Sequence, residues 1–383
     1  MGESGTGTRP RVNSVAIELT AHCNQKCDYC YNEWRDDNGA SLGRGAQSPM
    51  LRRVKKLFAA LELDHVTLTG GEPFSSPEVW PLLDLCAAAD LGVHIISNGG
   101  LVTDALATRL AAYGQRIRYV QITLNGPDAA LHGEHVGGEE HFDKTLRGVA
   151  AFRAAGVTVV GCTVVTRKNA AAVGATLELW HTLGVRHVAL SRFSPAGYAR
   201  SHVAALLPSR ADIVEAFGQA LPYARERDMR LTCTMPIPPC VLDWQEYAPI
   251  ELGVCAIATP LQEFALGPEG KLKNCTLHRT AIGGARDILD EGVDVAALVT
   301  APEVRRYHDR LPDFCQGCLH QKSCAGGCGA AAEWVLGLAG ERRLPDPFLW
   351  QHVDDDFELE LARAREGEGR APGTGRRRLD VIL

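Results

Sequence analysis

Short apolar stretches alternate with longer amphipathic ones along the first two thirds of the chain. The apolar stretches have the β-branched or alternating character of strands, and they lie at 14–20, 65–69, 93–97, 119–124, 158–166 and 187–191. Stretches with helical character lie between them, at 49–61, 77–89, 103–113, 142–155 and 169–183. Repeated strand–helix units form parallel sheets with right-handed crossovers. Six units predict an α/β fold, a partial (β/α)6 TIM-like barrel, with ligands at the C-terminal ends of its strands.

The pattern changes after residue 230. A last regular helix is predicted at 210–227, and the following residues are interrupted by prolines and become rich in Cys and Gly, with little periodicity. This composition predicts a small Cys-rich domain held together by metals rather than by an apolar core. One charged helix is predicted near 347–365. We therefore expect a flexible N-terminus, a barrel, a Cys-rich domain, and a charged helix with a flexible tail, at 1–13, 14–230, 231–340 and 341–383.

Charge and hydropathy exclude several classes of protein. The 383 residues carry a formal net charge of −6, which does not favour a nucleic-acid partner. No apolar run is long enough to span a membrane. Residues 1–13 lack the apolar stretch of a signal peptide. We expect a cytoplasmic protein that binds neither nucleic acid nor a membrane.

The chain has 13 cysteines, which are distributed unevenly. Three lie within 23–30 and four within 315–328, and Cys240, Cys255 and Cys275 are among those that lie between. In a reducing compartment, grouped cysteines are more often metal ligands or catalysts than disulfides. The two groups therefore predict two metal-bearing regions.

The first group, Cys23, Cys27 and Cys30, directly follows the first predicted strand with C-x3-C-x2-C spacing. Thiolates suit iron–sulfur clusters or zinc. A four-iron cube held by three cysteines keeps one iron free for a substrate or cofactor. Closed structural zinc sites usually pair one C-x2-C with a second pair elsewhere. The spacing favours an open iron–sulfur cluster and leaves zinc as an alternative.

This loop resembles the signature of the radical S-adenosylmethionine (SAM) superfamily, C-x3-C-x-aromatic-C, with Tyr29 as the aromatic residue. The second predicted strand ends in Gly70, Gly71, Glu72 and Pro73, which is similar to the GGEP motif of that superfamily. The resemblance implies that the three cysteines hold the SAM-binding [4Fe–4S] cluster and that the GGEP turn contacts the amino group of SAM. The chemistry agrees, because glycines let the backbone approach a ligand and a carboxylate accepts hydrogen bonds from an ammonium.

Other strand ends resemble the same superfamily. Asn98 lies in a turn similar to the TNG turn after strand three, and Thr123 and Asn125 lie in one similar to the SLDG ending of strand four. The resemblance places these residues near the ribose and carboxylate of SAM. Asn125 stands where Asp is usual, so a turn-forming Asn–Gly pair is an equal alternative. Arg192, at the end of strand six, is predicted to pair with the SAM carboxylate or to make a surface contact.

The later cysteines resemble the SPASM extension of radical SAM enzymes, which carries two auxiliary [4Fe–4S] clusters. Their spacing is C-x14-G-x4-C followed by C-x2-C-x5-C-x3-C. The resemblance implies a first auxiliary cluster bound by Cys255, Cys275 and Cys328. It implies a second auxiliary cluster bound by Cys315, Cys318 and Cys324. A zinc-ribbon-like site is the alternative.

The chain departs from this pattern in one respect, because it has no cysteine beyond Cys328 where the family has a seventh. We predict that Cys240 is an additional ligand, to the first auxiliary cluster, with Cys233 as a weaker candidate. We predict that the fourth ligand of the second cluster is a carboxylate such as Asp346 or Asp354, or the histidine His352. The alternative is that this fourth position is open. The remaining two cysteines, Cys86 and Cys162, are predicted to be ordinary buried residues.

The resemblance implies the chemistry. An external donor such as a flavodoxin or ferredoxin would reduce the first cluster, and SAM would be cleaved to methionine and a 5′-deoxyadenosyl radical. That radical would take a hydrogen atom from the substrate, and the protein would position the reactants and exclude water. The auxiliary clusters would accept an electron or bind the substrate. The motifs assign no catalytic base or hydrogen donor.

Three functions compete. The first is a maturase in natural-product biosynthesis that forms a cross-link, thioether or epimer in a ribosomal peptide. Residues 1–13 are too short for a leader-binding domain, so we expect either a separate leader-peptide-binding protein or recognition of the leader through the C-terminal region. The second is a small-molecule dehydrogenase or epimerase that acts on an aminosugar or cyclitol. The third, a non-catalytic iron–sulfur or zinc scaffold, is disfavoured by the intact SAM motif.

Overall fold

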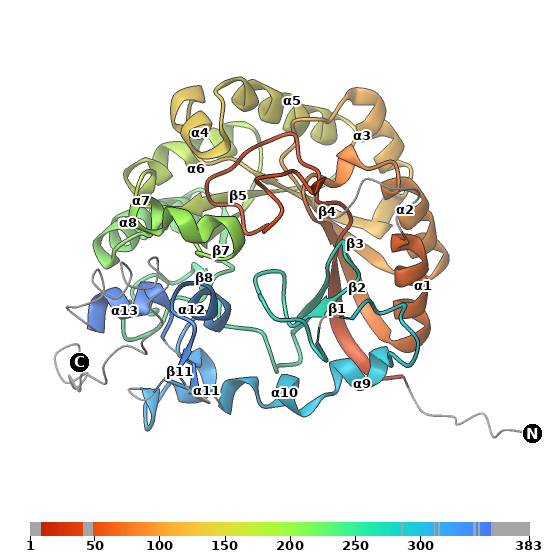
Figure 1. The fold of residues 1–383 in the computed structure, drawn as a ribbon. Coiled ribbons are helices and arrows are strands. Elements are labelled where there is room, and N and C mark those ends of the chain that lie inside the picture. Colours follow the sequence, from red (N-terminus) through yellow and green to blue (C-terminus); the bar gives the residue numbers. More distant parts are fainter. Residues whose placement is uncertain are drawn as a thin grey trace, which may run out of the picture.

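A computed structural model describes residues 9–40, 49–284, 286–309, 311–312, 315–339, 342–343 and 345–353. Its centre is a curved sheet surrounded by helices (Figure 1). Six consecutive strands pair in parallel in sequence order: β1 (Arg11–Glu18), β2 (Glu62–Thr69), β3 (Gly92–Ser97), β4 (Ile117–Thr123), β5 (Val159–Val165) and β6 (His187–Arg192). The predicted partial barrel is therefore confirmed.

Helices follow these strands and lie outside the sheet (Figure 1). They are α1 (Met50–Ala60), α2 (Val79–Ala88), α3 (Asp104–Ala111), α4 (Ala129–Val136), α5 (Glu140–Ala154), α6 (Val173–Thr182), α7 (Val203–Leu206) and α8 (Arg210–Glu226). Short 3-10 turns occur at η2 (Pro73–Ser75), η3 (Gly114–Arg116), η4 (Ala170–Ala172), η5 (Gly197–His202) and η6 (Tyr307–Asp309). Side-chain caps begin several helices, because unpaired N–H groups there need acceptors. For example, Asp128 accepts from Leu131 N at 2.9 Å and so starts α4, a helix that the sequence pattern did not predict.

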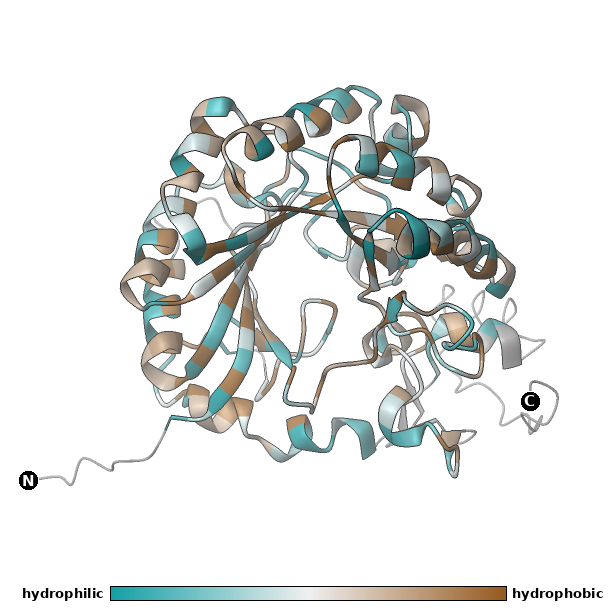
Figure 2. Cartoon of the chain, turned by 180° about the vertical axis from the view of Figure 1, so that it is seen from behind, coloured by the Kyte–Doolittle hydropathy of each residue, from teal (hydrophilic) through white to brown (hydrophobic). Residues whose placement is uncertain are grey.

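The core lies between the strands and the outer helices. The seven residues of β5 are apolar or small and almost all buried, as expected for a parallel strand covered on both faces. Phe152 of α5 and Trp180 of α6 are fully buried against it in one contiguous apolar cluster. Figure 2 shows hydrophobic positions along the strands and mixed positions on the surrounding helices. This core fixes the strand ends, on which the predicted site residues lie.

Residues after 230 extend the sheet at both edges. β7 (Arg230–Cys233) and β8 (Glu251–Leu252) continue it beyond β6. At the other edge, β9 (Glu263–Leu266) pairs in parallel with β1, and β10 (Leu272–Lys273) pairs antiparallel with β9. Apolar residues of β9 and β10 belong to the barrel core. The sequence predicted that metals, rather than an apolar core, hold the Cys-rich region together. In the structure, this region shares the apolar core of the barrel.

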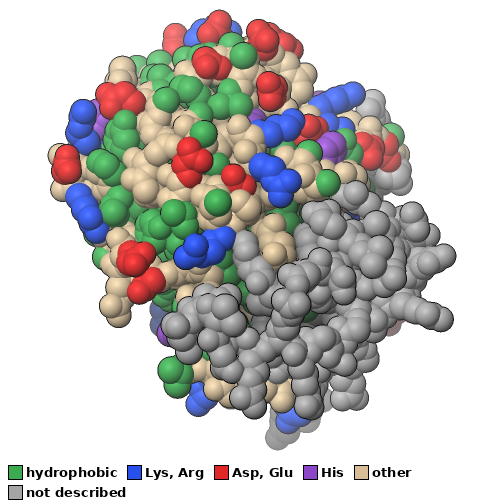
Figure 3. Space-filling model, turned by 90° about the vertical axis from the view of Figure 1, so that its left-hand side faces the viewer, with side chains coloured by type: hydrophobic (Ala, Val, Ile, Leu, Met, Phe, Trp, Pro, Cys, Tyr) green, Lys and Arg blue, Asp and Glu red, His purple; other side chains and the backbone are tan. Residues whose placement is uncertain are grey.

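The later described residues, from α9 to α13, lie between the two open edges of the sheet (Figure 1). They form α9 (Val295–Val299), α10 (Pro302–Arg305), α11 (Gln321–Cys324), α12 (Gly329–Val335), the hairpin strands β11 (Leu338–Ala339) and β12 (Arg342–Arg343), and α13 (Pro347–Val353). α13 lies within the predicted charged helix, whose remainder lies outside the described residues. No described helix is long and apolar enough to cross a membrane. Figure 3 shows charged side chains of both signs interspersed over the visible, non-grey part of one face.

Candidate active site

The three-cysteine loop follows β1 and is held by backbone hydrogen bonds to two helical elements, α4 and η5. Lys26 N donates to Val136 O at 3.2 Å and Asp28 N to His135 O at 3.0 Å, which ties the loop to the end of α4. Cys30 O accepts from Ala199 N of η5 at 2.9 Å. The loop has no regular secondary structure, yet its neighbours fix its path.

The three thiols lie within electrostatic reach of one another. Burial raises the pKa of Cys23 to about 11 and that of Cys30 to about 12. The pKa of Cys27 is raised well above its usual value by burial and then by its two neighbours, Cys30 and Cys23. Crowded, buried thiols resist ionisation unless a cation is present. Among the described residues, no group of three or more His, Cys, Asp or Glu side chains is gathered around one point that could hold a metal ion.

The GGEP turn lies directly against this loop. Gly71 N donates to Thr20 O at 2.6 Å, and Glu72 N donates to His22 O at 2.8 Å. A Cβ on Gly71 would lie 2.0 Å from His22 O, and one on Gly70, whose φ is +124°, would lie 2.5 Å from Thr20 O. The sequence argument used these glycines to bring the backbone close to a ligand. In the structure, the absence of a side chain at these two glycines lets the turn pack against the cysteine loop.

The Glu72 side chain joins the GGEP turn to the end of β3. Its buried carboxylate accepts from Ser97 Oγ at 2.9 Å, Asn98 N at 2.8 Å and Phe74 N at 3.1 Å. Burial raises the pKa of Glu72 to about 7, and the three donors lower it. A carboxylate has about four acceptor positions, so about one remains for a further donor.

Asn98 connects this network to the cysteine loop. Its Nδ2 donates to Asn24 Oδ1 at 2.8 Å and lies 3.8 Å from Cys23 Sγ. Its Oδ1 accepts from Gly100 N at 2.8 Å, which shapes the turn after β3. The structure therefore places Asn98 beside the first cysteine, and its contact with SAM stays a prediction.

Asn125 has a structural role at the end of β4. It is fully buried, and its Oδ1 accepts from Val164 N at 2.9 Å while its O accepts from Asn169 Nδ2 at 3.0 Å. Its backbone N donates to His132 Nδ1 at 3.1 Å. Thr123 hydrogen-bonds to Cys162, which counters the burial that raises the pKa of that thiol to about 12. Contacts of Thr123 and Asn125 with SAM remain predictions.

Tyr29, the aromatic residue of the first motif, lies inside the loop. Burial raises its pKa well above the usual value, and its hydroxyl interacts with Cys27 and with Asn125. The residue thus links the cysteine loop to the end of β4. This contact explains physically why an aromatic ring with a polar tip suits the position.

Arg192 does not make the surface contact that was one of its two predicted roles. Its side chain has no exposed area and donates to Asp346 Oδ2 at 2.6 Å and to Pro236 O at 3.1 Å. Asp346 also accepts from Cys328 N at 2.8 Å and from Phe348 N at 2.9 Å. The guanidinium therefore holds Pro236 and Asp346, and its pairing with the SAM carboxylate stays a prediction. Asp346, a candidate cluster ligand, is engaged by these three donors.

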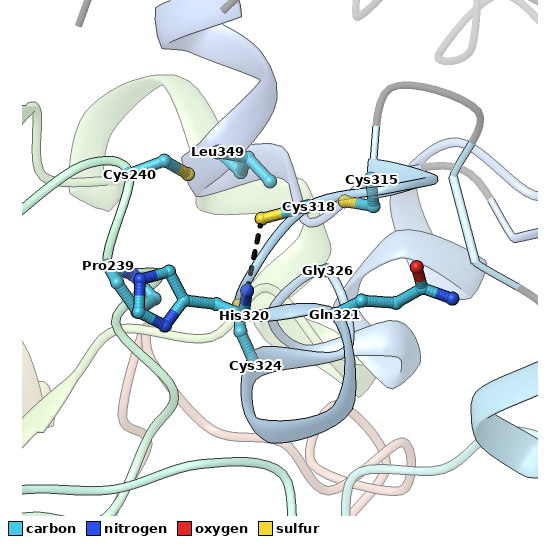
Figure 4. A pocket seen from close by; sticks show the side chains of 9 residues that line it. All are labelled: Pro239, Cys240, Cys315, Cys318, His320, Gln321, Cys324, Gly326 and Leu349. Atoms are coloured by element: carbon cyan, nitrogen blue, oxygen red, sulfur yellow. Dashed lines mark hydrogen bonds between the residues drawn. The ribbon is translucent and has the colours of Figure 1, made fainter. Parts of the chain in front are cut away.

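The later cysteines form two groups. Cys275 packs beside Cys328, and its pKa is raised by burial and then by Cys328 and Cys255. Figure 4 shows the second group in one pocket, which is lined by Cys240, Cys315, Cys318 and Cys324. The prediction that Cys240 belongs with the first group was therefore wrong. The loop after β7 carries Cys240 to the other group, and sequence spacing does not report that path.

The remaining cysteine predictions can be placed. Cys86 and Cys162 are buried, as predicted. Cys233 is also buried, and its thiol donates to Met235 O at 3.2 Å. The other candidate ligands, Asp354 and the side chain of His352, lie outside the described residues.

The sequence argument missed the buried ion pair between Lys273 and Glu18. Lys273 Nζ of β10 lies 3.0 Å from Glu18 Oε2 at the end of β1, and the two side chains are 6% and 1% exposed. Glu18 raises the pKa of Cys30, and Lys273 lowers that of Cys275. The pair therefore lies between the cysteine loop and the first later group. The sequence did contain one indication of this pair, because the charged residue Glu18 lies at the end of an otherwise apolar strand.

The comparisons with known proteins agree with this geometry. Residues 17–179 match the Radical SAM superfamily. The chain contains a radical SAM domain. The prediction of a radical SAM enzyme is thereby confirmed. The match covers the cysteine loop, the GGEP turn and the ends of β3 and β4.

Similar proteins extend beyond that domain. The chain is 26% identical over 347 residues to a PqqA peptide cyclase of Methylobacterium nodulans, covering 89% of this chain and 87% of the relative. It is 28% identical over 358 residues to the mycofactocin maturase MftC of Mycobacterium tuberculosis, covering 91% and 84%. The fold is similar to the structure of anSMEcpe with bound AdoMet and a Cp18Cys peptide. That match has a TM-score of 0.64 at 16% identity, covering 94% of this chain and 99% of the other.

The packing of Gly71 can be tested by substitution. In Gly71→Ala, the new Cβ would meet the backbone oxygen of His22, and overpacking of this kind costs about 1–3 kcal/mol. We expect a lower unfolding temperature and less iron bound after anaerobic reconstitution. Gly218→Ala is the matched control, since a Cβ there has no atom within 4 Å. Equal iron content in the two variants would contradict the proposed packing.

Glu72→Gln tests the carboxylate network. The amide replaces one acceptor oxygen by a donor, which would face a backbone or hydroxyl donor and cost about 1–3 kcal/mol. Because the pKa of Glu72 is raised from 4.5 to about 7, the folded state holds more protons than the unfolded state in that interval. The contribution of Glu72 to stability should therefore fall as pH rises from 4.5 to about 7. Unfolding curves of wild type and Glu72→Gln across this interval measure the difference, and parallel pH profiles would refute it.

Proposed function

We propose that this chain is a peptide maturase that cleaves SAM reductively and takes a hydrogen atom from a peptide to form a cross-link, thioether or epimer. The observation that supports this most directly is the three-cysteine loop packed against the GGEP turn inside a radical SAM domain. The two motifs are joined by direct backbone hydrogen bonds, Gly71 N to Thr20 O and Glu72 N to His22 O. A SAM molecule bound to one motif would thus be within reach of the other.

The residues of the loop fit an open [4Fe–4S] cluster. Cys23, Cys27 and Cys30 are thiols from one short loop that influence one another electrostatically. Three such thiols bind three irons and leave a fourth position for SAM. When bound and reduced, the cluster supplies the electron that splits SAM into methionine and a 5′-deoxyadenosyl radical. An external flavodoxin or ferredoxin is the proposed electron source.

The side chains around the loop would orient SAM and keep water out. The remaining acceptor position of Glu72 suits the SAM ammonium, and Asn98 holds the adjacent turn against Asn24. Thr123 and Asn125 are at the next strand end, where ribose and carboxylate contacts are proposed. Buried groups of this kind exclude water, which would otherwise compete for a reactive species.

The peptide substrate is supported by the named relatives. One is a peptide cyclase, another is a maturase, and a solved neighbour has a bound peptide. The two sequence relatives match about nine tenths of this chain, including its Cys-rich region. These names favour a peptide over an aminosugar or cyclitol. A separate leader-peptide-binding protein is proposed as the partner that delivers it, and the cytoplasm is the proposed location.

Two auxiliary [4Fe–4S] clusters are proposed for the later cysteines. The set of Cys255, Cys275 and Cys328 and the set around Cys318 each bring together thiols from distant parts of the chain. Grouped thiols without disulfides suit cluster ligation. The auxiliary clusters would accept an electron from the substrate or bind it. The whole Cys-rich region is proposed to be a SPASM domain.

Anaerobic incubation with SAM and dithionite tests the core reaction. Wild-type protein should form 5′-deoxyadenosine, and Cys27→Ala should form none, because the cluster loses a ligand. Cys86→Ala is the control for the loss of an unrelated cysteine, since Cys86 is buried in the core. Identical traces from wild type and Cys27→Ala would refute the proposal.

Iron analysis and a substrate assay test the remaining parts. Three four-iron clusters require about twelve irons per chain, whereas about four would remove the auxiliary clusters. A precursor peptide encoded beside the gene should lose two hydrogens on cross-linking, or gain solvent deuterium on epimerisation. Modification of an aminosugar or cyclitol, with the peptide left unchanged, would instead favour the small-molecule alternative.

A further inference from the structure

We infer that Cys240 is the fourth ligand of the second auxiliary cluster, which would then be held by four cysteines and have no open iron. This inference rests on the proposed auxiliary clusters. It adds a ligand from a loop that precedes both cysteine motifs of the Cys-rich region.

The pocket brings Cys240 to the three cysteines of the C-x2-C-x5-C motif. The pocket is partly open to solvent, its empty space is about 360 Å³, and it is lined by residues of three chain segments, namely Pro239, Cys240, Cys315, Cys318, His320, Gln321, Cys324, Gly326 and Leu349. Figure 4 shows the side chains of Cys240 and Cys318 approaching from opposite sides, with their sulfur atoms directed toward each other. The pKa of Cys240 is raised by burial and then by Cys324 and Cys318. Four cysteines from two segments of the chain thus line one pocket.

The loop that carries Cys240 is held firmly. Val241 N donates to Pro238 O at 2.9 Å, and Trp244 Nε1 donates to Ile237 O at 2.9 Å. Arg210 Nε of α8 donates to Val241 O at 2.7 Å. Val241 and Leu242 are buried in the barrel core. The thiol is therefore positioned by the barrel rather than by the motif that it faces.

Of the competing ligands whose side chains are described, Asp346 is engaged elsewhere and His320 is exposed. The carboxylate of Asp346 accepts from Arg192 and from two backbone N–H groups. His320 also lines the pocket, but it is exposed, whereas Cys240 is packed against the apolar core. A soft, partly buried thiolate is a better ligand for an iron–sulfur cluster than an exposed imidazole.

The two groups would then differ in what they can do. Four cysteines leave no iron of the second cluster for a substrate, which suits electron transfer. The first group has the three cysteines Cys255, Cys275 and Cys328, and Ser194 Oγ lies 4.0 Å from Cys328 Sγ. Substrate contact, if it involves an auxiliary cluster, is therefore assigned to the first group.

Alkylation of the reconstituted full-length protein tests this ligand directly. Iodoacetamide labelling of Cys240, quantified by mass spectrometry, should be about tenfold slower in the loaded protein than after iron chelation, because a bound thiolate is not a free nucleophile. Protection should persist in Cys275→Ala, which disrupts the first group, and be lost in Cys318→Ala, which disrupts the second. The opposite pattern, or equal labelling with and without iron, would overturn the inference.

A spectroscopic measurement keeps the test independent of labelling. In Cys240→Ser, the electron paramagnetic resonance signal of one reduced auxiliary cluster should change, while Cys233→Ser should resemble wild type. An unchanged spectrum in Cys240→Ser, or the same change in His320→Ala, would exclude Cys240 as the fourth ligand. Wild-type protein with only about four irons would refute the auxiliary clusters themselves. Full iron content with unprotected Cys240 would refute this inference alone.

Discussion

The site depends on close backbone contact between the ends of the first two strands. Gly71 N donates to Thr20 O at 2.6 Å, and a Cβ at that glycine would lie 2.0 Å from His22 O. This contact requires the absence of a side chain, so it makes the GGEP turn specific in shape. It also fixes the entry of the cysteine loop, which has no regular hydrogen-bond ladder of its own. Further bonds to α4 and η5 hold the rest of the loop.

From this contact, a polar network passes along successive strand ends. Glu72 accepts from Ser97 and Asn98, and Asn98 in turn reaches Asn24 beside Cys23. Parallel strands place all their C-terminal ends at one edge, so residues some 25 positions apart in sequence become neighbours. The network fixes the carboxylate before any ligand arrives. Preorganised groups of this kind need no rearrangement when charge develops.

The Cys-rich region is joined to the barrel by apolar packing and by buried charge. β9 and β10 add strands to the edge of β1, and Lys273 of β10 pairs with Glu18. On the opposite side, Arg192 pairs with Asp346, which also accepts from Cys328 N. Breaking one partner of a buried pair typically costs about 3–5 kcal/mol, since the other charge stays buried. These pairs hold the later cysteines in a defined position relative to the first loop.

The sequence by itself determined the six strand–helix units, the loop with three cysteines and the GGEP turn. It also showed that most of the later cysteines have the spacing of metal-binding motifs. Each of these follows from residues that are near one another in the chain, where spacing fixes the neighbours. The tertiary structure decided three further features. These are the group of cysteines that Cys240 lies in, the hydrogen bonds by which Glu72 connects the GGEP turn to the end of β3, and the pairing of Arg192 with Asp346. Cys240 and Cys315 are 75 positions apart, and Arg192 and Asp346 are 154 apart. Such contacts are set by how the barrel folds and by which buried charge needs a partner, and no local pattern records them.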